Sequence, residues 1–249
     1  MKQLLFSIHV LLISTLALAQ PSTLLEEAKS YERQYKTLQA IAAYQEYKRQ
    51  HPKDIDAVVR IAELYVMYAD EVSIEVEKKK FLDSAQQEVL YGFSLDSLNA
   101  NCFYARALLM GKQIEFVSVK EKAALTKAIK EDADYALIID PQNVKAMHLL
   151  GKWNMEVAAL NPAARAAMKI VFGGLPNASK ETALELLQEV RKRSPNFLAN
   201  NYDLSLLYKT MGRPREAIEL LQVQMKLPTK TMEDVLIKKR SKELLDSLL

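Results

Sequence analysis

Residues 201–228 read NYDLSLLYKTMGRPREAIELLQVQMKLP, and this stretch decides the fold class. Apolar residues recur in it at helical spacing on both sides of Gly212, and an alternation of period two is hard to find. Ser205 lies before the glycine and Ala217 after it, and both are small enough to let two helices approach closely. The stretch therefore predicts a pair of helices packed against each other.

Similar helix pairs are predicted along the rest of the chain, and several of them end near a proline. The three breaks are His51-Pro52 after Tyr44-x-x-Tyr47, Asp140-Pro141 after Tyr135-Ala136, and Ser194-Pro195 after Leu187-x-x-Val190. A proline at such a position cannot continue the preceding helix, but it can begin the next one. Small residues again stand at the predicted helix contacts: Ala28 with Ala40, Ala62 with Ala85, and Ala183 after Gly151.

The pairs repeat with a period near 34 residues, so the chain predicts about five repeats over residues 21–228. Two of the repeats are longer than that period. About eleven extra residues lie between Tyr65 and Ala85, and about twenty between Asn154 and Ala183. The predicted fold class is all-α.

The motif Tyr208-x-x-x-Gly212-x-x-x-x-Ala217-x-x-x-Leu221 resembles the tetratricopeptide repeat, as do Leu150-Gly151 and the Asp140-Pro141 break. The resemblance implies a tetratricopeptide-like α-solenoid of about five helix pairs over residues 20–230. Residues 231–249 are predicted to form a C-terminal capping helix, because a solenoid must cover its last apolar face. The residues expected to cover it are Leu236, Leu244, Leu245 and Leu248.

Residues 140–228 also resemble a particular group of helical repeat proteins, the regulator of microtubule dynamics family. The motifs that carry this resemblance are Gly151-Lys152-Trp153, Phe172-Gly173-x-x-Pro176, Ala183-Leu184, Ser194-Pro195-Asn196 and Asn201-Tyr202. Members of that family are associated with microtubules and with membrane contact sites. The N-terminal region differs from those of the eukaryotic members, because here it has the pattern of a cleavable export signal. An exported protein would meet no microtubules, so the resemblance implies the fold of the family and not its cytoskeletal role.

Residues 1–19 have the pattern of a cleavable signal peptide. Lys2 gives a positive start, residues 4–18 are almost wholly apolar, and Ala17-Leu18-Ala19 offers small residues at the cleavage site. The alternative is a membrane anchor, but an apolar run of about fifteen residues is shorter than the ~20 needed to span a bilayer. We therefore expect the mature chain to be exported, either to the periplasm or into the medium, and not to be an integral membrane protein.

Composition excludes several functional classes. The chain of 249 residues has only six glycines, and neither a GxGxxG nor a GxxxxGK[ST] run occurs, which argues against nucleotide-binding enzymes. Its three histidines and single cysteine, Cys102, have no metal-ligand spacing. Carboxylate pairs such as Glu26-Glu27 stand at predicted helix starts, where the helix dipole favours them. The sequence predicts no enzyme activity, no cofactor and no metal site.

Nucleic-acid binding is also not expected. The sequence pI is about 8.7, and 31 acidic residues are interspersed among 34 basic ones. A nucleic-acid-binding domain would have a pI above ~9 and its basic residues gathered on one face. The basic runs 78–80, 191–193 and 238–240 are better explained as solvated helix ends.

A candidate binding surface follows from the repeat pattern. His148 and Lys152 are four residues apart and so share one face of a first helix, the face that lines the concave groove of a repeat array. Equivalent placement predicts a mostly basic groove formed by Lys29, Arg33, Tyr104, His148, Lys152, Tyr202 and Lys209. Such a groove would suit an acidic peptide or a phospholipid head group. The alternative is that these are ordinary solvated residues on exposed helix faces.

Two further features have both a structural and a functional interpretation. Trp153, the single tryptophan, either packs in the core, which is the commoner situation, or lines a pocket. The stretch Gly173-Gly174-Leu175-Pro176 either ends a helix before a new one that begins after Ser179, or forms a hinge.

Three functional hypotheses therefore remain open. The first is an exported scaffold that binds a peptide or protein partner in its concave groove. The second is a carrier of a lipid or another apolar ligand, with the two insertions roofing the groove. The third is a structural subunit of an envelope assembly, bound through its convex face.

Overall fold

The computed structural model describes residues 21–173 and 177–249, and these residues form twelve α-helices, one short 3-10 helix and no strand. The helices are α1 (Pro21–Arg33), α2 (Thr37–Gln50), α3 (Ile55–Glu71), α4 (Glu75–Leu95), α5 (Ala100–Gln113), η1 (Ile114–Phe116), α6 (Val119–Ile139), α7 (Val144–Ala158), α8 (Pro162–Phe172), α9 (Lys180–Arg193), α10 (Leu198–Thr210), α11 (Pro214–Lys226) and α12 (Met232–Asp246).

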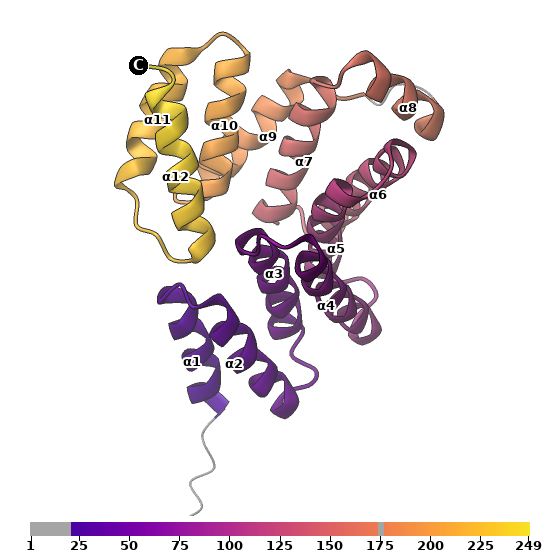
Figure 1. Ribbon diagram of the computed structural model, residues 1–249, viewed down its shortest axis with the longest axis vertical. Coiled ribbons are helices and arrows are strands. Elements are labelled where there is room, and N and C mark those ends of the chain that lie inside the picture. The colour runs from indigo at the N-terminus through magenta and orange to yellow at the C-terminus, as the bar shows by residue number, and fades with distance from the viewer. Residues whose placement is uncertain (1–20, 174–176) are drawn as a thin grey trace, which may run out of the picture.

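The helices pack as successive pairs. Four pairs are consecutive in the chain, α1 with α2, α3 with α4, α5 with α6 and α10 with α11, while α7 pairs with α9 across the intervening α8. Figure 1 shows the pairs following one another in an arc, which brings α11 and α12 back toward α1 and α2. The predicted all-α solenoid of about five helix pairs is therefore confirmed.

Each predicted break lies where a helix ends. Helix α2 ends at Gln50, α6 at Ile139 and α9 at Arg193, each just before one of the proline-containing turns. Two of the following helices, α3 and α7, begin with side chains that accept hydrogen bonds from the otherwise unpaired backbone N–H groups of the first turn, whereas α10 begins after Phe197 without such a cap. The Asp54 carboxylate accepts from the Ala57 N–H, and the Asn143 side chain accepts from the Ala146 N–H.

Small side chains mark the closest helix contacts, as predicted. The small residues predicted to lie at these contacts are fully or almost fully buried: Ala28, Ala40, Ala62, Ala85, Ala183, Ser205 and Ala217. Gly151 of α7 lies against α9 so tightly that a Cβ atom there would come within 2.8 Å of Leu187 Cδ2. The core of the array is therefore a series of interfaces between neighbouring helices, each covering an apolar face of the next.

The two insertions take different forms. The extra residues between Tyr65 and Ala85 lengthen existing helices, giving 17 residues in α3 and 21 in α4. The extra residues between Asn154 and Ala183 form the separate helix α8, which packs on α6. Gly173, with φ of 72°, ends α8, and the Ser179 side chain accepts from the Thr182 N–H at the start of α9. The structural interpretation of this loop is thus supported at both its ends.

Helix α12 follows the last pair and packs on α10 and α11. A capping box formed by Thr231 and Asp234 begins it. Ser241 of α12 accepts a hydrogen bond of 2.7 Å from the Gln224 amide of α11, between two fully buried side chains. Leu244 is also buried, and Leu248 packs against the apolar cluster of α9, α10 and α11.

Two of the sequence predictions lie outside the described residues: the signal peptide of residues 1–19, and the Gly174-Leu175-Pro176 part of the loop after α8. Among the helices that are described, none combines the length and the apolar character that crossing a bilayer requires.

Candidate functional site

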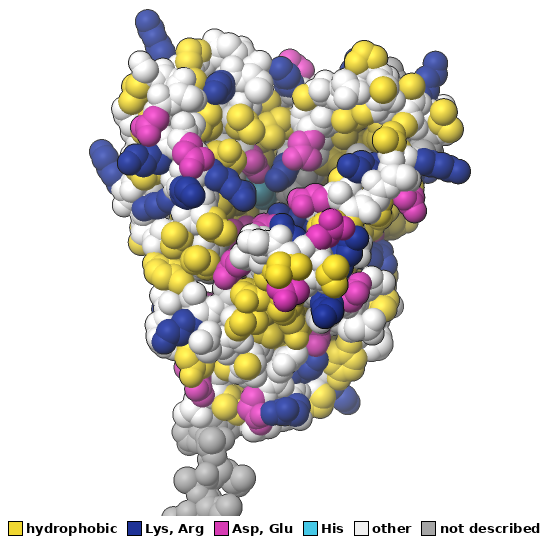
Figure 2. All heavy atoms as spheres, in the orientation of Figure 1, with side chains coloured by type: hydrophobic (Ala, Val, Ile, Leu, Met, Phe, Trp, Pro, Cys, Tyr) yellow, Lys and Arg dark blue, Asp and Glu magenta, His cyan; other side chains and the backbone are white. Residues whose placement is uncertain are grey.

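The concave side of the arc holds a cavity of about 650 Å³. The first helices of four pairs, α3, α5, α7 and α10, line it together with α12, and α6 and α8 close one end. Figure 2 shows that charged side chains of both signs gather around the hollow in the middle of this face. The cavity has two parts with different chemistry, which we call the charged wall and the apolar recess.

The charged wall consists of ionisable side chains from α3, α5, α7, α10 and α12. Its members are Arg60, Glu63, Asp70, Lys112, Lys145, His148, Lys152, Glu156, Asp203, Glu233 and Arg240. The apolar recess lies between α5 and α8. Its members are Leu108, Ile114, Val119, Ala123, Ile129, Leu149, Trp153, Val157, Leu160, Ala164, Ala167 and Met168.

Arg60 organises the N-terminal end of the charged wall. Its Nε donates to both carboxylate oxygens of Glu32 at 3.1 and 3.2 Å, and its Nη1 donates to Glu63 at 2.6 Å. The Tyr44 hydroxyl also donates to Glu32, at 2.8 Å. Because Glu32 belongs to α1 and Tyr44 to α2, this network ties the first pair to the floor of the cavity on α3.

Glu63 connects α3 with α7. Its Oε1 accepts from Lys145 Nζ at 2.5 Å, while its other oxygen accepts from Arg60. Burial by itself raises the pKa of the Glu63 carboxyl, but Lys145 and Arg60 outweigh this effect, and the pKa lies below its usual value. The Glu63 carboxylate is therefore charged and doubly paired near neutral pH.

Tyr104 of α5 lies between these two helices. It is buried, and the Nζ of Lys145 lies 5.5 Å from the centroid of its ring. Burial, with Glu63 nearby, raises the pKa of the Tyr104 phenol well above its usual value. Tyr104 thus offers the cavity a neutral, mostly apolar surface covered by a cation.

His148 and Asp203 join α7 to α10 in the C-terminal half of the wall. The His148 Nε2 and the Asp203 Oδ2 share a hydrogen bond of 2.8 Å, and the Phe197 ring meets the imidazole edge-on with centroids 4.9 Å apart. Burial raises the pKa of Asp203, but the bond from His148 and the charge of Lys152 more than offset it, and the pKa is lowered. Asp203 in turn raises the pKa of Lys152.

Trp153 forms the floor of the apolar recess. Its side chain is buried, its Nε1 donates to the Thr126 carbonyl at 2.8 Å, and Lys130 Nζ lies 5.7 Å from its ring. The core interpretation of Trp153 is confirmed, because its ring belongs to the apolar cluster of α5–α8. The same ring also lines the cavity, so the structural and the pocket interpretations both hold.

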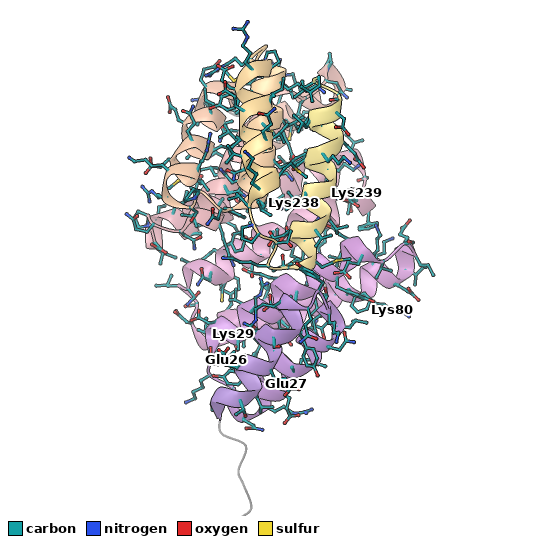
Figure 3. All side chains as sticks on the ribbon, turned by 90° about the vertical axis from the view of Figure 1, so that its left-hand side faces the viewer. Glu26, Glu27, Lys29, Lys80, Lys238 and Lys239 are labelled. Carbon is teal, nitrogen blue, oxygen red and sulfur yellow. The ribbon has the colours of Figure 1, made fainter. Side chains whose placement is uncertain are left out.

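The structure brings four of the seven predicted binding residues together in the cavity, namely Tyr104, His148, Lys152 and Tyr202. The other three lie elsewhere. Lys29 pairs with Glu26 on α1 at 3.0 Å, and Figure 3 shows Lys29 beside Glu26 on that helix. Arg33 is exposed at the end of α1, and Lys209 donates to the Ser247 hydroxyl at 3.1 Å. These three do not belong to the cavity lining among the described residues.

The expectation of a mostly basic groove is not met in this cavity. Six basic side chains line it, but so do six acidic ones: Glu63, Asp70, Glu115, Glu156, Asp203 and Glu233. The predicted groove contained only basic and aromatic residues and left out the acidic residues on the same helix faces. Glu63 lies three residues after Arg60 and Glu156 four after Lys152, so helical spacing could have signalled both acids.

Outside the cavity, the basic runs of the sequence lie on different elements. Figure 3 shows Lys80 on α4 well away from Lys238 and Lys239 on α12. Within the part of the chain that the structure describes, no group of three or more His, Cys, Asp or Glu side chains is placed to hold a metal ion.

The comparisons with known proteins agree with this architecture. The family model described as regulator of microtubule dynamics protein 1-3 matches residues 24–249. The chain belongs to this family. Relatives include regulator of microtubule dynamics protein 3 of Bos taurus, 25% identical over 195 residues, which are 78% of this chain and 41% of the relative. Protein 2 of Rattus norvegicus is 23% identical over 204 residues, which are 82% and 50% of the two chains.

The chain spans about half the length of the curated family members that it matches. Among solved structures, a thermophilic TPR protein of Thermus thermophilus superposes with a TM-score of 0.62 at 12% identity, covering 90% of this chain and 98% of that one. PilW, described as a widely conserved type IV pilus biogenesis factor, superposes with a TM-score of 0.51 at 16% identity, covering 91% and 92%. These similarities confirm the tetratricopeptide-like fold of the family member described here.

Proposed function

We propose that this chain is a scaffold that binds a segment of a partner protein in the cavity on its concave face. The family and the fold are those of helical-repeat scaffolds, and the proposal includes no catalytic step. The observation that carries it is the cavity itself, which is lined by the inner helices of successive repeats, as a groove for an extended segment would be.

The chemistry of the lining indicates the kind of segment that would fit. The apolar recess can take a bulky apolar side chain, and a buried apolar anchor is the usual source of binding energy in such contacts. The charged wall presents both signs, so it would pair with a segment that carries both acidic and basic residues. A purely acidic peptide, which a basic groove would favour, would meet repulsion from Glu156 and Glu233.

A pair of matched substitutions tests the proposal. Ala199 of α10 lines the cavity and is half-buried, whereas Ala42 of α2 is exposed and lies outside the lining. Ala199→Arg places a long side chain in the cavity from a helix position that tolerates arginine. Ala42→Arg adds the same side chain to an outer helix.

The readout is photo-crosslinking from a residue introduced at Tyr202, which lines the cavity, with Gln222 on the exposed side of α11 as the control position. We expect a protein crosslinked from position 202 and not from 222. The Ala42→Arg background should keep this product, and the Ala199→Arg background should lose it. Crosslinks that form only from position 222 would instead favour binding through the convex side, as in an envelope assembly.

A second candidate function is carriage of an apolar ligand, and the apolar recess favours it. Helix α8, formed by the second insertion, covers this recess with Ala164, Ala167 and Met168. Native mass spectrometry of the purified protein distinguishes the two functions. A bound lipid or other apolar molecule, with no protein crosslinked from position 202, would put carriage first. A protein product without a bound small molecule would support the scaffold.

We further propose that the mature chain acts after export, which removes it from microtubules. This rests on the pattern of residues 1–19 alone. N-terminal sequencing of the mature protein tests it: an N-terminus at Gln20 is expected, and an intact Met1 would contradict the proposal.

A further inference from the structure

Two turns at opposite ends of the array have the same backbone conformation but very different residues. In the last pair, Gly212 has φ of 72°, and the Arg213 N–H donates to the Tyr208 carbonyl at 2.9 Å. In the first pair, Tyr35 has φ of 61°, and the Lys36 N–H donates to the Tyr31 carbonyl at 3.0 Å. The turn between the two helices of a pair is thus the same left-handed turn in both places.

Glycine is the residue that such a turn favours, because a side chain in the left-handed region crowds its own backbone. Within the described residues, Tyr35 is the only residue other than glycine with a positive φ. A large aromatic side chain there carries a conformational cost that glycine would avoid. A strained position of this kind persists where the surrounding structure stabilises it, and it often has a function.

The Tyr35 hydroxyl makes a contact that Gly212 has no side chain to make. It shares a hydrogen bond of 2.6 Å with the Thr229 hydroxyl, and it lies 3.4 Å from the Thr229 carbonyl oxygen. Thr229 lies in the segment between α11 and α12, 194 residues further along the chain. Figure 1 shows this segment next to the α1–α2 turn, so the contact joins the two ends of the arc.

A repeat array is held together mainly by contacts between neighbouring repeats, so small rotations at each interface add up along its length. One contact between the two ends limits that accumulated motion. Motion between the two ends would change the width of the cavity, because α3 near one end of the arc and α12 at the other both line it. Helix α12 itself packs on α10 and α11.

We propose that Tyr35 and Thr229 form a clasp that closes the repeat array around the cavity, and that release of the clasp widens the space between α3 and α12. The inference does not depend on what the cavity binds. The clasp would set the width of the entrance for a protein segment or for a small ligand alike.

Spin–spin distance measurements on the full chain test this inference. Labels on cysteines introduced at Gln50 of α2 and Gln222 of α11 report the separation of the two ends, since both positions are exposed and neither takes part in the contact. The native thiol does not compete, because Cys102 is buried and burial raises its pKa to about 11. The test variants are Tyr35→Phe and Thr229→Val.

Tyr31→Phe is the matched control. It also removes a tyrosine hydroxyl from the first helix pair, but that hydroxyl donates to Glu27 within α1 and does not connect the two ends of the array. We expect one narrow distance distribution in the unaltered chain and in Tyr31→Phe. Tyr35→Phe and Thr229→Val should both give a broader distribution shifted to longer distances. A distribution in Tyr35→Phe that matches the unaltered chain would overturn the clasp, as would equal broadening in Tyr31→Phe.

Trp153 gives a second readout at the cavity itself. It is the only tryptophan of the chain, it is buried, and it lines the apolar recess. Opening of the array should raise the acrylamide quenching constant of its fluorescence in Tyr35→Phe and leave it unchanged in Tyr31→Phe. Broader distances without increased quenching would overturn the part of the proposal that couples the clasp to the cavity.

Discussion

The Nζ atom of Lys145 in α7 lies 2.5 Å from Oε1 of Glu63 in α3, although the two residues are 82 positions apart in the sequence. Helix α5 stands between these helices in the order of the pairs, and its Tyr104 lies under the Lys145 cation. This ion pair therefore spans a whole repeat across the concave face. It joins α3 and α7 where the charged wall is formed.

Removal of the Glu63 carboxylate should destabilise the protein strongly. The Glu63 side chain is almost completely buried and pairs with two cations. In Glu63→Gln, Arg60 and Lys145 would both lose this charged partner. Loss of these two charge-assisted contacts should cost about 1.5–3 kcal/mol, because Lys145 is partly exposed and Arg60 keeps its pair with Glu32. Urea unfolding measures this loss. The control is Glu26→Gln, whose carboxylate pairs with Lys29 at the surface and should change the free energy of unfolding by less than ~0.5 kcal/mol. Equal effects in the two variants would contradict the central role of Glu63.

The Asp203 carboxylate should make stability depend on pH in the acid range. Its pKa is lowered in the folded protein, so it contributes stability above its unfolded pKa of about 4, and this contribution is lost as the pH falls through the folded value. The unaltered chain should exceed Asp203→Asn in free energy of unfolding at pH 7, and the difference should shrink toward pH 3. Urea titrations of both proteins at the two pH values check this. A constant difference would show that the carboxylate charge is not what stabilises the fold.

Replacement of two glycines by alanine should change the stability of the protein in opposite directions. In Gly151→Ala the new Cβ would come within 2.8 Å of Leu187, so α7 and α9 must move apart, at a cost of about 1–3 kcal/mol. In Gly111→Ala of α5 no atom beyond the chain neighbours and the helix's own backbone lies within 4 Å of the new Cβ, and the better helix propensity should stabilise the protein by about 0.5–1 kcal/mol. Thermal unfolding of both variants measures these changes in stability. Destabilisation by both would mean that the helix contacts are not set by small residues.

The fold was predictable because its signals are local. Helical periodicity, the proline breaks and the small residues at helix contacts all occur within about one repeat, and residues such as Ala28 and Ala40 are buried together as that pattern requires. The form of the insertions was not predictable in the same way. Lengthening α3 and α4, or adding α8, satisfies the same local pattern.

The candidate site was only partly predictable, because the cavity depends on how the repeats curve. Residues on the inner face of a first helix, such as His148 and Lys152, were found from their spacing of four. Lys29 and Arg33 have the same position within their repeat, but the first pair lies outside the cavity lining. Partners such as Glu63 for Lys145 meet only through the superhelix, and no local spacing indicates them.

Binding of a partner segment to the three forms of the protein is the most direct test of the concave-face claim. Isothermal titration of the segment identified by crosslinking at position 202 should give the same affinity for the unaltered chain and for Ala42→Arg. Ala199→Arg should bind at least about tenfold more weakly, which corresponds to ~1.4 kcal/mol. Unchanged affinity in Ala199→Arg, with the protein still folded, would contradict binding in the cavity.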